Sequence, residues 1–125
     1  MDKQFGYFVE CKRKEKKINL RKLAELIGIA PAYMSDIEKG NRYPPDKEKL
    51  YKIVAALELD ETDTCKLFDL AALAKDNSVS PDLPEYIMGN EKLRIALRMA
   101  RDQKAGDDDW MKVIKMLESK VDGQN

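Results

Sequence analysis

The stretch that decides the fold spans residues 19–45 and reads NLRKLAELIGIAPAYMSDIEKGNRYPP. Asn19 is a favourable helix N-cap, and Gly28 suits the left-handed position just past a helix end. Pro31 suits the first turn of a further helix, which Gly40 ends. Two short helices joined by a tight turn that contains glycine form a helix-turn-helix, so this stretch predicts that motif.

Helical periodicity continues on both sides of the motif. A first helix is predicted over about residues 3–16. Asp46 is placed to cap a fourth helix, and Asp60 or Thr62 to begin a fifth. The side chains expected in the core share one face of each helix. They are Phe5, Phe8, Val9, Leu20, Leu23, Leu26, Ile27, Met34, Ile37, Leu50, Ile53, Val54, Leu57, Leu67, Phe68, Leu70, Ala71 and Leu73. We therefore predict an all-α, five-helix domain over residues 1–75.

The helical pattern breaks at residues 76–84, which contain two prolines and mostly polar side chains. Beyond the break, residues 85–88 are predicted to form a helical turn and residues 91–102 a helix. A last helix starts at residues 107–109, where acidic side chains favour a helix N-terminus. The apolar residues of these helices again share faces: Leu93, Ala96, Leu97, Ala100, Trp110, Val113, Ile114 and Leu117. We predict a separate C-terminal helical segment over residues 76–125.

The formal net charge is zero, but the charges are unevenly distributed along the chain. Residues 1–57 hold 13 basic and 8 acidic side chains, whereas residues 58–125 hold 10 and 15. A basic half is typical of a chain that meets a polyanion, although small helical domains also scatter charge in this way. The run KRKEKK at residues 12–17 has the same two interpretations, as a DNA-binding patch or as a solvated helix end.

Composition excludes several function classes. The absence of histidine excludes histidine base catalysis and Cys/His zinc sites. Capping explains the acidic cluster Asp107–Asp109, so we expect no enzyme, no catalytic residue, no metal and no cofactor. Cys11 and Cys65 lie far apart and are expected to be reduced core residues. There is neither a signal peptide nor an apolar run of the roughly 18 residues that span a membrane, so a cytoplasmic protein without membrane contact is expected.

The helix-turn-helix stretch closely resembles the phage-repressor-like (Xre) helix-turn-helix family, and the resemblance extends to about Leu59. The matching features are Leu23-Ala24, Gly28, apolar Ile29, the segment Ser35-x-Ile37-Glu38-Lys39-Gly40 and the proline that ends the loop. The resemblance implies a lambda-repressor-like five-helix DNA-binding domain followed by a C-terminal helical extension. It also pairs Arg13 with Glu38 as a tie between two helices. Packing explains other matched positions, since Ala24 is small where two helices cross.

The same resemblance implies that the outer face of residues 31–39 reads base edges in the major groove. Four residues are the base-contacting candidates: Ala32, Tyr33, Ser35 and Asp36. Ala32 suits a thymine methyl group, and Asp36 suits a cytosine amine. An aspartate that faces DNA otherwise costs Coulomb energy, so a nearby lysine is the alternative partner of Asp36.

Phosphate contacts are implied at the start of the first helix of the motif and in the loop after the second. The candidates are Asn19, Lys39, Asn41 and Arg42. Two positions depart from the family pattern. Leu20 stands where the family often has glutamine, and Ala30 stands where it often has a serine or threonine cap. Neither departure breaks the fold. The phosphate contacts that the glutamine and the serine or threonine would make in the family are not expected from Leu20 and Ala30.

These observations predict a sequence-specific double-stranded DNA-binding transcriptional regulator, acting as a repressor on a two-fold symmetric operator. Because the amphipathic helices of residues 76–125 cannot bury their apolar faces alone, they must fold onto the first domain or onto a second copy of the chain. Regulators of the family that this chain resembles usually bind two-fold symmetric sites as dimers, so we expect this segment to form a homodimer. The competing interpretation is a surface for another protein, to which four methionines would contribute: Met88, Met99, Met111 and Met116. The alternative function is therefore an antitoxin-type component whose C-terminal helices bind a partner protein.

Overall fold

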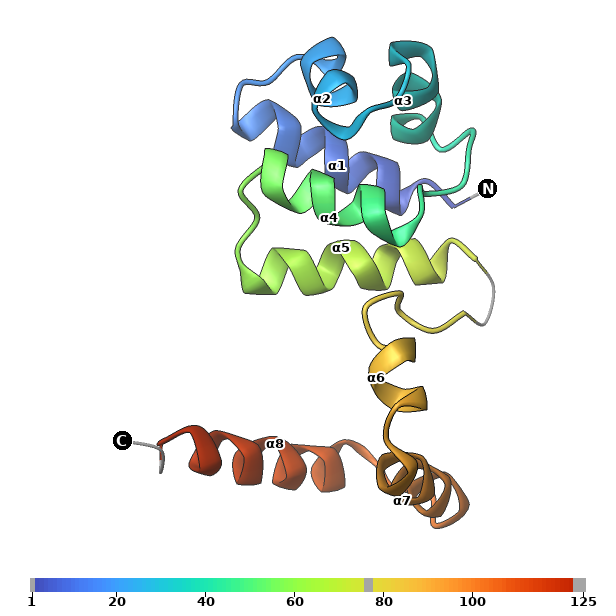
Figure 1. The fold of residues 1–125 in the computed structure, drawn as a ribbon, viewed down its shortest axis with the longest axis vertical. Helices are drawn as coiled ribbons and strands as arrows, with labels where there is room; N and C mark the ends of the chain where they lie inside the picture. The colour runs from blue at the N-terminus through green and yellow to red at the C-terminus, as the bar shows by residue number, and fades with distance from the viewer. Residues whose placement is uncertain (1, 76–77, 123–125) are drawn as a thin grey trace. The chain divides into compact units, whose positions relative to one another are not determined.

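The computed structural model describes residues 2–75 and 78–122, and within those ranges it contains eight helices and no strand (Figure 1). The helices are α1 (Gln4–Glu15), α2 (Leu20–Ile27), α3 (Pro31–Glu38), α4 (Lys47–Ala56), α5 (Glu61–Leu73), α6 (Pro84–Met88), α7 (Glu91–Asp102) and α8 (Asp107–Asp122). The predicted all-α class is therefore confirmed. The chain divides into two compact units, Met1–Pro84 and Glu85–Asn125. The boundary expected after residue 75 adjoins residues 76–77, which lie outside the described residues.

Side-chain caps and left-handed residues set the limits of the first helices. The Asn19 side chain accepts a hydrogen bond from the backbone N–H of Lys22 at 2.8 Å, which starts α2. Gly28 ends α2 with a φ of +79°, and apart from its two chain neighbours no atom lies within 4 Å of the place where its Cβ would stand. Glycine is thus favoured there for its backbone conformation rather than for lack of space. Pro31 opens α3 as predicted.

The core of the first unit joins all five of its helices. Figure 1 shows α2 and α3 side by side at one end of this unit and α5 at the other, with α1 and α4 between them. The buried apolar residues are Phe5, Phe8, Val9, Leu23, Ala24, Ile27, Met34, Ile37, Leu50, Ile53, Leu57, Leu67, Phe68, Leu70 and Ala71. Two leucines expected in this core are exposed instead, Leu26 by 45% and Leu73 by 64%. Since each residue turns a helix by about 100°, both lie beyond the edges of the buried faces.

The two cysteines were also expected in the core, and that expectation is wrong. Cys11 is half-buried and Cys65 is exposed, and both are free thiols. Phe5, Phe8 and Val9 form the buried face of α1, and Cys11 falls outside it. Cys65 likewise precedes the buried face of α5, which begins at Leu67.

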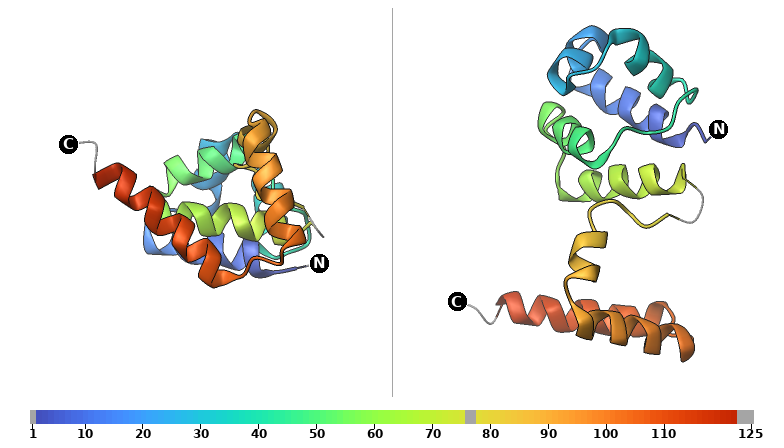
Figure 2. Two further views of the ribbon diagram at one scale, coloured as in Figure 1. Left: turned by 90° about the horizontal axis from the view of Figure 1, so that it is seen from below. Right: turned by 45° about the vertical axis from the view of Figure 1, so that its right-hand side comes forward.

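The second unit has no buried side chain among residues 85–121. Within it, α7 and α8 diverge from the turn that joins them (Figure 2, left). The large apolar side chains of α8 stay exposed: Trp110, Met111, Val113, Ile114, Met116, Leu117 and Val121. This unit therefore lacks a core of its own. No helix among the described residues is long and apolar enough to cross a membrane.

Candidate nucleic-acid interface

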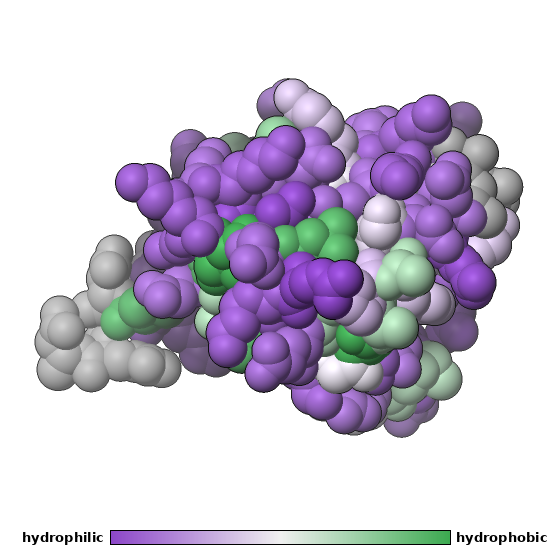
Figure 3. Space-filling model, turned by 90° about the horizontal axis from the view of Figure 1, so that it is seen from above, coloured by the Kyte–Doolittle hydropathy of each residue, from purple (hydrophilic) through white to green (hydrophobic). Residues whose placement is uncertain are grey.

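The end of the first unit that carries α2 and α3 presents a mostly hydrophilic surface with a smaller apolar strip (Figure 3). Met34 and Ile37 anchor α3 beneath this surface, because both are buried in the core. Among the predicted base-contacting residues, Ala32 is exposed, whereas Tyr33, Ser35 and Asp36 are half-buried. All four belong to α3, which places them on one element.

Three of the candidate residues come together just beyond α3, in a group that we call the Arg42 cluster (Tyr33, Asp36 and Arg42). The guanidinium carbon of Arg42 lies 5.1 Å from the centroid of the Tyr33 ring. Arg42 Nε lies 4.0 Å from Asp36 Oδ2. The partner of Asp36 is thus an arginine and not the lysine considered from the sequence. Since both side chains are about half exposed, the pair orients Arg42 more than it stabilises the fold.

A left-handed turn brings Arg42 back over α3. Gly40 has a φ of +79°, and the N–H of Asn41 donates to the carbonyl oxygen of Asp36 at 2.9 Å. This is the chain reversal that glycine favours at a helix end. The Arg42 cluster was not predicted from the sequence. Gly40, between Asp36 and Arg42, indicates in the sequence that the chain reverses after α3. It does not indicate the direction of the Arg42 side chain.

The other predicted phosphate contacts lie on both sides of the motif. Asn19 uses its side-chain oxygen to cap α2, which leaves its amide group to donate to a further acceptor. Lys39 and Asn41 are exposed after α3. At the start of α3, Ala30 makes no side-chain cap, as expected for alanine. The motif therefore offers donors before α2 and after α3.

Arg13 and Glu38 form the tie between α1 and α3 that the sequence suggested. Arg13 Nε donates to Glu38 Oε2 at 2.7 Å and Arg13 Nη2 donates to Glu38 Oε1 at 3.0 Å. Arg13 Nη1 also donates to the carbonyl oxygen of Ile18 at 3.0 Å. The pKa of Arg13 is raised mainly by the hydrogen bond to Glu38, whereas burial of the guanidinium lowers this pKa. The arrangement locks the end of α3 to α1 and to the loop before α2.

Basic side chains in the run at residues 12–17 form ion pairs with acidic residues of the first unit. Lys12 Nζ lies 2.9 Å from Asp63 Oδ2, and Lys16 Nζ lies 3.6 Å from Glu58 Oε2. The hydrogen bond to Asp63 is the main cause that raises the pKa of Lys12. These contacts favour the helix-end interpretation of the run over the DNA-binding patch.

The acidic surplus of residues 58–125 comes from only the first part of that range. Residues 58–84 hold two basic and seven acidic side chains, whereas residues 85–125 hold eight of each. The surplus thus belongs to the part of the first unit that contains α5, while the second unit is balanced. Within the first unit, α2 and α3 themselves carry three acidic side chains, those of Glu25, Asp36 and Glu38.

Comparison with known proteins identifies relatives of this chain. The helix-turn-helix domain family matches residues 6–76, more than half of the chain. The ImmF control region 10 kDa protein of Bacillus phage phi105 is 38% identical over 58 residues, which are 46% of this chain and 63% of the phage protein. A solved chain of the SinR protein/SinI protein complex is 19% identical with a TM-score of 0.44. That alignment covers 94% of this chain and 98% of the other.

Proposed function

Since the chain belongs to the phage-repressor-like (Xre) helix-turn-helix domain family, we propose that it is a sequence-specific double-stranded DNA-binding transcriptional regulator. The observation that carries the proposal is α3, whose inner face is fixed in the core while donors flank it on the outside. B-form DNA has a major groove wide enough to admit one such helix. In this proposal α3 enters that groove, as helices of this motif do.

The base-reading role is assigned to the outer face of α3. Ala32 contacts a thymine methyl group, and Ser35 donates to or accepts from a base edge. Tyr33 lies under the Arg42 guanidinium, so its ring supports Arg42 while its hydroxyl remains available to DNA. Asp36 either accepts from a cytosine amine or serves only to orient Arg42.

The phosphate contacts are assigned to Asn19, Lys39, Asn41 and Arg42. Arg42 is the strongest of these, because a guanidinium that is already oriented loses less side-chain entropy when it meets a phosphate. Asp36 lies near Arg42 and attracts its guanidinium, but both side chains are about half exposed, so solvent screens this attraction. A phosphate can therefore compete with Asp36 for Arg42.

We expect Arg42→Ala to weaken binding to the cognate duplex about fivefold at moderate salt, and to reduce the slope of log K against log salt by about one. The reason is the loss of one phosphate contact. Fluorescence anisotropy at several salt concentrations measures both quantities. Arg98→Ala on α7 is the matched control, since Arg98 is an exposed arginine of the other unit. Equal effects of the two variants on affinity and slope would remove Arg42 from the interface.

The regulator is proposed to be a repressor that occludes a promoter. The phage relative supports a regulatory role, since its name places it in a control region.

Selection of bound sequences from a random duplex library tests the sequence specificity directly. The proposal predicts a two-fold symmetric consensus with half-sites about one helical turn apart. Recovery of unrelated sequences after repeated selection would count against it.

A homodimer through the second unit is proposed as part of this function. The unit leaves the apolar stripe of α8 in solvent, including Ile114 and Leu117. A second copy of the same two helices would cover that stripe, and the resulting two-fold symmetry would match a palindromic site.

The alternative function, binding of a different protein as an antitoxin-type component does, is favoured by four exposed methionines. Methionine side chains suit an adaptable contact, and these are Met88, Met99, Met111 and Met116.

We expect Ile114→Asp to raise the dimer dissociation constant at least about tenfold, because it places a charge in the apolar interface. Size-exclusion chromatography with light scattering at tens of micromolar measures the change. Ser119→Asp adds the same charge on the opposite side of α8 and should leave the dimer intact. A wild-type chain that is monomeric at this concentration would reject the homodimer and favour the antitoxin-type alternative, in which the segment binds another protein.

A further inference from the structure

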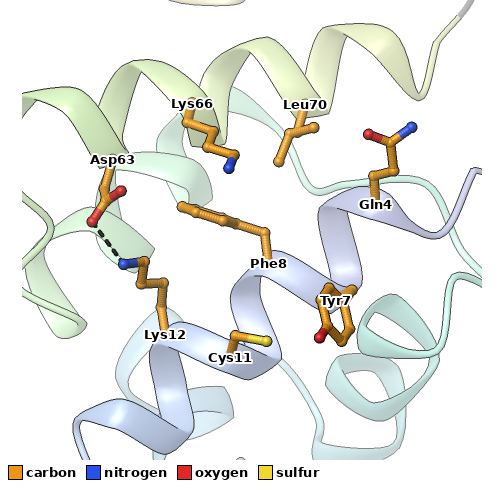
Figure 4. Close-up of a pocket in the computed structure, with 8 residues that line it drawn as sticks. All are labelled: Gln4, Tyr7, Phe8, Cys11, Lys12, Asp63, Lys66 and Leu70. Carbon is orange, nitrogen blue, oxygen red and sulfur yellow. Dashed lines mark ion pairs between the residues drawn. The ribbon is translucent and has the colours of Figure 1, made fainter.

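A cavity of about 360 Å³ lies between α1 and α5 of the first unit (Figure 4). Its lining includes Tyr7, Phe8 and Lys12 of α1 and Asp63, Lys66 and Leu70 of α5. None of the residues proposed to contact DNA belongs to this lining. The volume falls within the range of small-molecule sites in proteins. We refer to this cavity as the α1–α5 pocket.

The α1–α5 pocket has an apolar floor. Phe8 and Leu70 form that floor, and both side chains are also part of the core. Their position is therefore held by packing, so the floor exists before any ligand arrives. Tyr7 is 68% exposed and Cys11 is half-buried, which adds an aromatic and a thiol side chain to the rim on the α1 side. A flat apolar group suits this surface.

The charges of the lining amount to a single unpaired positive charge. Lys12 is neutralised, since its ammonium group lies 2.9 Å from Asp63 and 3.4 Å from Glu15. Lys66 reaches from α5 over the Phe8 ring, with its ammonium group 5.4 Å from the ring centroid. Among the described residues, no carboxylate forms an ion pair with Lys66. An aromatic ring attracts a cation but does not neutralise it.

We propose that the α1–α5 pocket binds a small molecule that combines a flat apolar body with one carboxylate. The body lies on Phe8 and Leu70, and the carboxylate accepts hydrogen bonds from Lys66. One carboxylate matches the net charge of the lining, whereas a dianion would leave a charge unpaired. The site is separate from the proposed DNA-binding surface, so this inference and the proposed function fail independently.

Titration of the ¹⁵N-labelled full chain with 2-naphthoate tests the proposal. We expect saturable shifts of backbone amide signals of α1 and α5, with a dissociation constant of about 1 mM for a probe of this size. Lys66→Met keeps the apolar stem but removes the charge, and should weaken binding about five- to tenfold. Lys92→Met, an exposed lysine of α7, is the matched control and should leave binding unchanged.

The neutral probe 2-naphthamide checks the role of the carboxylate without any mutation. It should bind about five- to tenfold more weakly than 2-naphthoate, as in the Lys66→Met variant. Three results would overturn the proposal: equal affinity for the two probes, unchanged naphthoate binding by Lys66→Met, or shifts confined to the exposed apolar faces of α7 and α8. Absence of saturable shifts up to about 10 mM naphthoate would overturn it as well.

Discussion

Replacement of Arg13 by alanine is expected to lower the free energy of unfolding by about 3–5 kcal/mol. The side chain of Glu38 is only 2% exposed, and both of its oxygens accept hydrogen bonds from Arg13. Without the arginine, a carboxylate would remain buried with no compensating charge. The carbonyl oxygen of Ile18 would lose its Arg13 donor at the same time. Urea denaturation followed by circular dichroism measures the loss.

Lys14→Ala is the control for this prediction. Lys14 is the next residue of α1, but its pair with Glu10 at 3.4 Å is at the surface and should contribute less than about 1 kcal/mol. The double replacement Arg13→Met with Glu38→Leu should recover much of the stability, because it removes the buried charges together. If Arg13→Ala costs no more than Lys14→Ala, the tie between α1 and α3 does not stabilise the fold.

Gly6→Ala should destabilise the protein by about 2 kcal/mol or more, although alanine is intrinsically about 1 kcal/mol better than glycine inside a helix. A Cβ at position 6 would stand 2.3 Å from the carbonyl oxygen of Ile37 and 2.4 Å from that of Glu38. Both are backbone atoms, so no rotamer change can relieve the clash. The end of α3 would have to move away from α1.

Gly106→Ala provides the comparison for Gly6→Ala. Apart from its two chain neighbours, no atom lies within 4 Å of the place where its Cβ would stand, so no clash opposes the change. Gly106 precedes α8 as its N-cap, where alanine is less favourable than glycine, so the loss of unfolding free energy should stay below about 1 kcal/mol. Urea denaturation of both variants under one set of conditions measures the difference. A Gly6→Ala protein as stable as the wild type would show that α1 and α3 tolerate a wider separation. It would also show that the contact with α1 does not hold α3 rigidly.

Local signals in the sequence were sufficient to predict the limits of the helices in the first unit. Asn19, Gly28 and Asp46 act through hydrogen bonds and dihedral angles within three or four residues, so neighbours along the chain determine their roles. The faces of the helices were predicted less completely. Periodicity identifies the centre of a buried face, but only the neighbouring helices decide how far it extends, which is why Leu73 is exposed.

The functional surfaces depended more strongly on tertiary structure. Arg13 and Glu38 could be paired from the sequence only through resemblance to the family, since 25 residues separate them. The Arg42 cluster needed the direction of the chain after Gly40. The α1–α5 pocket was not predicted at all, because its volume depends on how two helices that are distant in sequence pack together.

The central claim is that the surface of α3 and the loop after it recognises a specific DNA sequence. Fluorescence anisotropy of the full chain tests it most directly, with a duplex selected from a random library and a shuffled duplex of the same composition, at about 50 and 200 mM salt. We expect saturable binding to the selected duplex that is at least about 10³-fold tighter than to the shuffled one, and weaker at the higher salt. Equal, weak binding to the two duplexes at both salt concentrations would contradict it.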